Sequence, residues 1–233
     1  MKKTTYLFWS VILLTFISCS DTFTEVTPDG SNADSYFNTE AEYQSALIGA
    51  YDLLQATFWN TLTSVVASDD YAAGGDSFNL DQPTLQNVNQ MIHTPNDENQ
   101  LREIWGLMYA GFNRANYILE FKDKTDFAGK EEIIAEAYFL RAYYTFELVK
   151  FFGNVPLKTE ERGGVMRISD ERILTEDEFS TERIADIPTA YGVIAADLLE
   201  AIPNLPATQD RPYEATKGAA QALLGKVYLY HGT

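Results

Sequence analysis

The chain has 233 residues, with 17 lysines and arginines against 34 aspartates and glutamates, so its formal charge at pH 7 is −17. This charge argues against a nucleic-acid-binding protein and against electrostatic docking on anionic lipid, because both need clustered basic residues. A hydrophobic content of 45% is too high for a disordered chain. The single cysteine excludes an internal disulfide framework and a zinc site built on cysteines.

The N-terminus has the pattern of a secretory signal peptide. Two lysines precede an apolar segment, residues 6–17, that is shorter than the roughly 20 residues of a membrane span. Cys19 follows Phe-Ile-Ser, where a signal peptide would be cleaved. This context resembles a bacterial lipobox, which implies removal of residues 1–18 and lipidation of Cys19; an ordinary signal peptide with an incidental cysteine is the alternative. Residues 19–38 are expected to form a flexible acidic tether.

Five segments after the tether repeat apolar residues with the period of an α-helix, and no strand pattern of comparable length competes with them. They are residues 40–58, 98–121, 130–151, 188–201 and 214–231. Thr39 and Glu42 have the spacing of a capping box before the first segment, and Phe58 is placed on its apolar face. Gly153 and Pro156 mark the end of the third. The chain is therefore predicted to be all-α.

Two long stretches without strong periodicity, about residues 61–95 and 153–187, are expected to be irregular loop insertions. Loops of this length in compact domains are usually functional. The last predicted helix would leave its apolar face uncovered where the sequence stops at Thr233. We therefore expect the sequence to be truncated.

Two segments carry a partial match to the first helix of a tetratricopeptide repeat. The matching residues are Leu224, Gly225, Tyr228 and Gly232 in the fifth segment, and Leu140, Arg141 and Tyr144 in the third. This spacing predicts a tetratricopeptide-like helical repeat solenoid. An ordinary bundle of amphipathic helices is the alternative, because it would supply much of the same pattern.

A broader resemblance rests on sequence strings. Residues 136–157, EAYFLRAYYTFELVKFFGNVPL, are similar to the hallmark stretch of the SusD/RagB family of outer-membrane nutrient-uptake lipoproteins from Bacteroidetes. Three further pieces agree in order, within residues 104–116, 191–206 and 215–230. Together with the lipobox, the resemblance covers essentially the whole chain. It identifies residues 39–233 as the N-terminal portion of a SusD-like α-helical domain, because family members are substantially longer.

The resemblance implies a binding protein without catalysis and without a cofactor. Such lipoproteins are held at the cell surface by a lipid anchor in the outer membrane. They capture glycans or peptides and deliver them to a SusC-like TonB-dependent outer-membrane transporter. The alternative function is a tetratricopeptide-like scaffold lipoprotein that binds a protein partner.

The ligand-binding candidates lie in the first irregular stretch and just before it. Capture of a sugar uses aromatic faces that stack on the ring and polar side chains that bind its hydroxyls, presented by loops. The candidates are Trp59, Asp69, Asp70, Tyr71, Phe78 and Asn79. Structural alternatives stay open for three of them: packing at a helix end for Trp59, and turn formation for Asp69 and Asp70.

Other conspicuous residues are assigned to structure. Trp105 continues an apolar helical stripe and is predicted to lie in the core. Arg141 is predicted to form a buried ion pair with a carboxylate, for which the options are Glu136, Glu147 and Asp197. Two asparagines of the second segment are expected to bind loop backbone groups; they are Asn113 and Asn116.

Enzymatic interpretations are weaker. His93 and His231 lack a metal-ligand spacing, and the sequence has no nucleophile elbow, phosphate loop or dinucleotide fingerprint. Glycoside hydrolysis needs two carboxylates at a set separation, but among 34 acidic residues such pairs arise by chance. We therefore predict no catalytic residue and no metal site.

Overall fold

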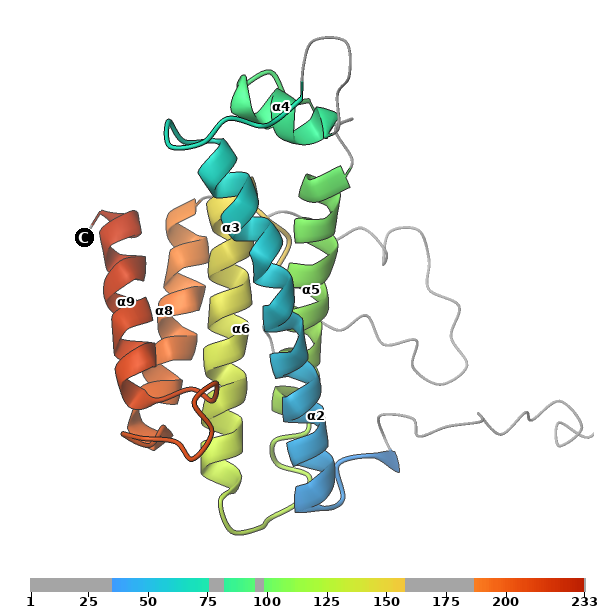
Figure 1. The fold of residues 1–233 in the computed structure, drawn as a ribbon. Helices are drawn as coiled ribbons and strands as arrows, with labels where there is room; N and C mark the ends of the chain where they lie inside the picture. Colours follow the sequence, from blue (N-terminus) through green and yellow to red (C-terminus); the bar gives the residue numbers. More distant parts are fainter. Residues whose placement is uncertain (1–34, 76–81, 95–98, 158–186, 233) are drawn as a thin grey trace, which may run out of the picture. The chain divides into compact units, whose positions relative to one another are not determined.

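The computed structural model describes residues 35–75, 82–94, 99–157 and 187–232. The chain divides into two units, residues 1–36 and 37–233, and the second is described below. Its helices are α2 (Glu40–Asp52), the 3₁₀ helix η3 (Leu53–Ala56), α3 (Thr57–Val66), α4 (Pro83–Asn89), α5 (Asn99–Glu120), α6 (Lys130–Phe152), α8 (Ile187–Asn204) and α9 (Lys217–His231). The described residues contain no strand, so the prediction of an all-α fold is confirmed (Figure 1). The predicted signal peptide and Cys19 lie outside the described residues.

Helix α6 is the centre of the second unit. It packs along α5 on one side and α8 on another, and it also contacts α2 and α9 (Figure 1). The pairs α5–α6 and α8–α9 are antiparallel neighbours, which is the side-by-side arrangement of a helical repeat fold. None of the helices in the described ranges is long and apolar enough to cross a membrane.

The helix ends follow the signals in the sequence. Thr39 and Glu42 form the predicted capping box: the Thr39 side chain accepts from the Glu42 N–H, and the Glu42 carboxylate accepts from the Thr39 N–H. Gly153 ends α6 with a φ of 68°, which favours glycine. Helix α8 continues to Asn204, three residues beyond the predicted end of the fourth segment, and contains Pro203 in its last turn.

The first predicted helix differs from the structure. After α2 the chain tightens into η3 and then continues as α3 to Val66, so the first irregular stretch begins later than expected and also contains α4. A 3₁₀ helix turns about 20° more per residue than an α-helix. The four residues of η3 therefore rotate the side chains of α3 by roughly 80° relative to the positions they would have in a continuous α-helix. Phe58, predicted on the buried face, is consequently 62% exposed.

A buried ion pair joins three helices. The Nε and Nη2 atoms of Arg141 on α6 donate to the two carboxylate oxygens of Asp197 on α8, at 2.8 and 2.6 Å. Arg141 Nη1 also donates to Oδ1 of Asn116 on α5, at 2.8 Å. The predicted buried pair is therefore confirmed, with Asp197 as the partner. Asn116 binds this guanidinium, and the expectation that it binds loop backbone is wrong.

A second buried network connects α2, α6 and the segment before α9. The hydroxyl of Tyr51 donates to Glu136 Oε2, and the Tyr51 oxygen accepts from the Ala215 N–H at 2.7 Å. Burial raises the pKa of Glu136 to about 7, against the lowering effect of the Tyr51 hydroxyl. Glu136 thus titrates near neutral pH inside the core.

Helices α5 and α6 approach closely at Gly111. A Cβ atom on Gly111 would lie 2.5 Å from the ring of Tyr144, which is fully buried and donates from its hydroxyl to the Ala50 carbonyl at 2.6 Å. Nearby, the half-buried Trp105 packs edge-on against Phe152, with ring centroids 5.0 Å apart. Trp105 therefore contributes to helix packing, but it is only half-buried, so its predicted place in the core is wrong.

Gly111→Ala should destabilise the protein by about 1–3 kcal/mol, because the added methyl group forces Tyr144 out of a fixed position. Gly106→Ala on the same helix is the matched control, since a Cβ there has no neighbour within 4 Å. The control should be neutral or slightly stabilising, because alanine favours helix. Urea unfolding measures both variants; equal midpoints would contradict the close approach at Gly111.

Glu136→Gln should change how stability depends on pH. The folded pKa of about 7 lies above the ordinary glutamate pKa of 4.5, so between these values the native state binds a proton that the unfolded state has released. Wild-type stability therefore falls as pH rises through this window, by roughly 3 kcal/mol relative to the glutamine variant. Urea unfolding at pH 4.5 and 8 tests this, with Glu131→Gln on the exposed side of α6 as the control. Parallel pH profiles for wild type and Glu136→Gln would refute the buried titration.

Candidate functional site

The site is built on α3, α4 and the loop between them. Of the predicted ligand-binding residues, Trp59 lies on α3, and Asp69, Asp70 and Tyr71 follow its C-terminal end. Phe78 and Asn79 lie outside the described residues. The structure thus places four of the candidates on one helix and the loop that leaves it.

Helix α3 is tied to the central helix by a buried polar group. Asn60 Nδ2 donates to Glu147 Oε2 at 2.6 Å, and both residues are buried. Lys150, one turn further along α6, donates to the other oxygen of Glu147 at 2.6 Å. A buried carboxylate that lost either partner would be costly, so this contact fixes the position of α3 on α6.

Side chains of α4 hold the loop in place. Asn89 Nδ2 donates to the Val66 carbonyl at 2.9 Å, and Asn89 Oδ1 accepts from the Ala73 N–H at 3.4 Å. The Gln86 side-chain amide donates to the Gly74 carbonyl. The chain is therefore bound to α4 at Val66 and again at Ala73 and Gly74, with Tyr71 between these positions.

A pocket of about 430 Å³ lies between these three parts. Its walls are mainly apolar and come from α3, the loop and the start of α4: Leu62, Val65, Val66, Tyr71, Ala72, Ala73, Gly74, Gln82 and Leu85. Its volume falls in the range of small-ligand sites. Gln82 at its rim accepts a hydrogen bond from Gln100 Nε2 at 2.8 Å, which ties the pocket to α5.

Tyr71 is the candidate that the structure favours. Its side chain is 67% exposed although it lines the pocket, so its ring is open to a ligand. Residues 67–75, called the braced loop below, are held by the hydrogen bonds of α4 to Ala73 and Gly74. An exposed aromatic ring beside an apolar hollow can stack on the carbon–hydrogen face of a sugar. The phenol hydroxyl and the nearby backbone supply hydrogen-bonding groups.

Asp69 and Asp70 are exposed beside Tyr71. Neither carboxylate makes a hydrogen bond or ion pair within the described part of the chain; the turn is formed by Ser68, whose hydroxyl donates to the Val65 carbonyl at 2.7 Å and accepts from the Asp70 N–H at 3.2 Å. Turn formation through the aspartate side chains, one of the two interpretations, is therefore not observed. Both carboxylates are available to solvent and to ligand hydroxyls.

Trp59 is not brought to the pocket. It lies on α3 about two turns before Val66, is half-buried, and contacts the ring of Phe58 edge-on with centroids 5.5 Å apart. Trp59 is in the first turn of α3, so its half-buried side chain fits packing at a helix end, the structural alternative given above. The exposed Phe58 and the half-buried Trp59 form a separate aromatic patch on α3.

The residues that hold the site were missed by sequence reasoning. Asn89 and Gln86 lie on a helix of seven residues inside a stretch predicted to be irregular. A signal was present, since Pro83 at the first helical position followed by Leu85 and Val88 is typical of a short amphipathic helix.

The arrangement of antiparallel helices defines a tetratricopeptide-like helical repeat protein, and comparison with known proteins agrees. A family model for SusD-like proteins, described as starch-binding and associating with the outer membrane, matches residues 22–229. The chain therefore belongs to the SusD-like family. SusD-like protein P2 of Formosa agariphila is 29% identical over 236 residues, which cover 95% of this chain and 42% of the relative.

Solved structures of the family share the fold. A laminarin-binding SusD-like protein is 35% identical, with a TM-score of 0.70 over 84% of this chain and 41% of its own. The surface glycan-binding protein A from Bacteroides fluxus is 27% identical, with a TM-score of 0.68 and the same coverage of 84% and 41%. The chain thus spans about two fifths of the length of the relatives it matches.

Asn89→Ala should loosen the loop without unfolding the helical stack. It removes two hydrogen bonds to the backbone at Val66 and Ala73, so amide hydrogen exchange in residues 67–75 should become faster. Global stability should fall by only about 1 kcal/mol. Gln90→Ala, exposed at the end of α4, is the control. Unchanged exchange in the loop would show that Asn89 does not brace it.

Proposed function

We propose that this chain is part of a cell-surface lipoprotein that binds a glycan and does not transform it. The observation that carries the proposal is the exposed Tyr71 ring beside an apolar pocket, on a loop bound by α4, in a member of the SusD-like family. Family membership supports an association with the outer membrane. The pocket has the aromatic face of Tyr71, and the two residues before Tyr71 in the chain carry exposed carboxylates, a combination that suits a neutral polyol.

Laminarin is the first glycan to test, because the name of a relative 35% identical to this chain states that it binds laminarin. Capture would leave the glycosidic bonds intact. A glycosidase needs two carboxylates on either side of the scissile bond, whereas Asp69 and Asp70 are adjacent exposed residues of one loop. Binding without hydrolysis is therefore the activity that the site supports.

Tyr71→Ala should weaken binding of laminarin oligosaccharides by roughly 5- to 10-fold, the contribution expected of one aromatic contact. Tyr71→Phe keeps the ring and should retain most of the affinity. Tyr228→Ala removes an exposed tyrosine on α9 and is the matched control. Isothermal titration measures all three variants, and their circular dichroism checks the fold. An unchanged affinity in Tyr71→Ala would exclude this site.

We further propose that Cys19 carries the lipid anchor and that the protein delivers its ligand to a SusC-like TonB-dependent transporter. The lipobox-like sequence before Cys19 supports the anchor, and membership of an outer-membrane-associated family supports the location. Residues 1–18 would be the signal peptide and residues 19–36 the tether. The predicted tether extends to residue 38, but Phe37 is 3% exposed and stacks on Phe121, so it belongs to the helical domain.

Cys19→Ala should abolish incorporation of labelled palmitate and release the protein from the membrane fraction. Ser20→Ala changes the adjacent residue and should leave labelling intact. Labelling is read by fluorography of the immunoprecipitated protein after growth with a palmitate analogue. Equal labelling of the Cys19→Ala variant would contradict the lipid assignment.

The second candidate function is a scaffold for a protein partner. It is supported by the helical repeat arrangement, because stacked helices of this kind form surfaces that bind proteins. Purification of the tagged lipoprotein from outer membranes in mild detergent separates the two functions. A β-barrel transporter in near-stoichiometric amount supports uptake, whereas another protein in its place, with no glycan binding, supports the scaffold.

A further inference from the structure

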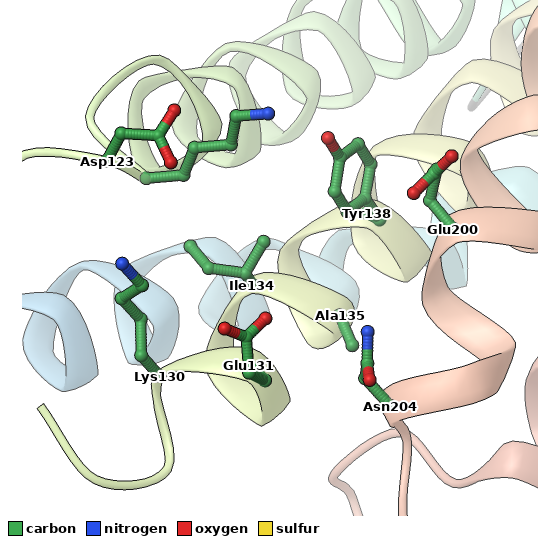
Figure 2. A pocket seen from close by; sticks show the side chains of 9 residues that line it. Asp123, Lys130, Glu131, Ile134, Ala135, Tyr138, Glu200 and Asn204 are labelled. Atoms are coloured by element: carbon green, nitrogen blue, oxygen red, sulfur yellow. The ribbon is translucent and has the colours of Figure 1, made fainter. Parts of the chain in front are cut away.

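A second pocket lies where the end of α5, the first half of α6 and the end of α8 meet (Figure 2). Its volume is about 200 Å³, and none of its walls comes from α3, α4 or the loop between them. Figure 2 shows Tyr138 and Glu200 together at one end of the pocket, with Asp123 and Lys130 at the other. This pocket is therefore separate from the Tyr71 site.

Several polar groups of this pocket have no partner inside the protein. In the described part of the chain, the ammonium of Lys122, the hydroxyl of Tyr138 and the side-chain amide of Asn204 make no hydrogen bond or ion pair. Lys130, in contrast, pairs with Asp126 at 2.6 Å. Unpaired donors and acceptors around one cavity are available to a ligand.

The aromatic wall of the pocket is fixed from behind. The guanidinium carbon of Arg141 lies 5.4 Å from the centroid of the Tyr138 ring, a cation–π contact. Arg141 is itself buried and bound to Asp197 and Asn116. The position of the Tyr138 ring is therefore set by the ion pair that joins the three helices, and a ligand would meet a preorganised surface.

Charge and size restrict what the pocket can hold. Lys130 is neutralised by Asp126. Among the described residues that line the pocket, the ammonium of Lys122 then faces three carboxylates, so the cavity disfavours anions. The lining carries both hydrogen-bond donors and acceptors, and a sugar hydroxyl can pair with either. Ile134 and Ala135 supply an apolar wall for carbon–hydrogen groups. The volume is below the usual range for drug-sized ligands, which leaves room for about one ring.

We propose that this pocket binds one neutral sugar ring, with Glu200 and Asn204 accepting from its hydroxyls, Lys122 and Tyr138 donating to them, and Ile134 against its apolar face. It is a second carbohydrate contact, independent of the Tyr71 pocket and of the glycan proposed for it. This contact would hold one sugar unit of a glycan against helices α6 and α8, away from the braced loop.

Methyl nuclear magnetic resonance of the chain titrated with methyl β-D-glucopyranoside tests the proposal. The methyl signals of Ile134 and Ala135 should shift in a saturable manner, and Glu200→Gln and Tyr138→Phe should each weaken binding by roughly threefold to tenfold. Glu103→Gln, exposed on α5 and outside the pocket, is the matched control and should bind as the wild type does.

Two comparisons separate this site from its alternatives. Tyr71→Ala should leave the Ile134 titration unchanged; loss of the Ile134 shift in that variant would overturn an independent site, whatever happens to glycan binding at the loop. Methylammonium and glucuronate are the other probes. Tighter binding of methylammonium would overturn the sugar assignment in favour of an amine, and equal binding of glucuronate would overturn the charge argument. Absence of any shift at Ile134 and Ala135 would overturn the proposal.

Discussion

The ion pair between Arg141 and Asp197 is the contact on which the arrangement of the helices depends. It lies in the core, its guanidinium is bound by a bidentate carboxylate on α8 and by an asparagine oxygen on α5, and Arg141 itself belongs to the central helix α6. Such a pair is costly to desolvate and more costly to break, because one partner would leave an unpaired charge in the core. It therefore specifies one relative placement of α5, α6 and α8.

Both candidate sites use this rigid stack as their support. Glu147, less than two turns after Arg141 on α6, fixes α3 through Asn60, and α3 with α4 carries the Tyr71 loop. On another part of the same helix, Arg141 itself fixes the Tyr138 ring of the second pocket. Binding groups on short segments attached to a packed helical core need little reorganisation when a ligand arrives.

The fold was largely predictable because its signals are local. Thr39 with Glu42, the stop at Gly153 and the apolar periods each depend on residues close in sequence, and the need of a buried arginine for a carboxylate is general. Sequence could not choose Asp197 among the possible partners, since that choice depends on the distance between helices far apart in the chain. It also missed the rotation caused by η3, because the tightening to a 3₁₀ helix is not marked by glycine or proline.

The sequence predicts only part of what defines the candidate site. The lack of helical periodicity around Asp69, Asp70 and Tyr71 predicts a loop, but the groups that hold this loop, Asn89 and Gln86, bind backbone atoms more than ten residues away. Trp59 was grouped with them by proximity in sequence, and the direction of α3 separates it from the pocket. Residues close in sequence can be assigned to one loop, but which of them can contact a ligand depends on the helices against which the loop packs.

The central claim is that glycan binding takes place at the braced loop. Amide hydrogen exchange of the chain with and without a laminarin oligosaccharide tests it most directly. The account predicts that protection on binding is greatest in residues 67–75 and the adjoining α4, while α6 exchanges as slowly as before. Protection confined to other segments, or none in residues 67–75 under saturating oligosaccharide, would contradict it.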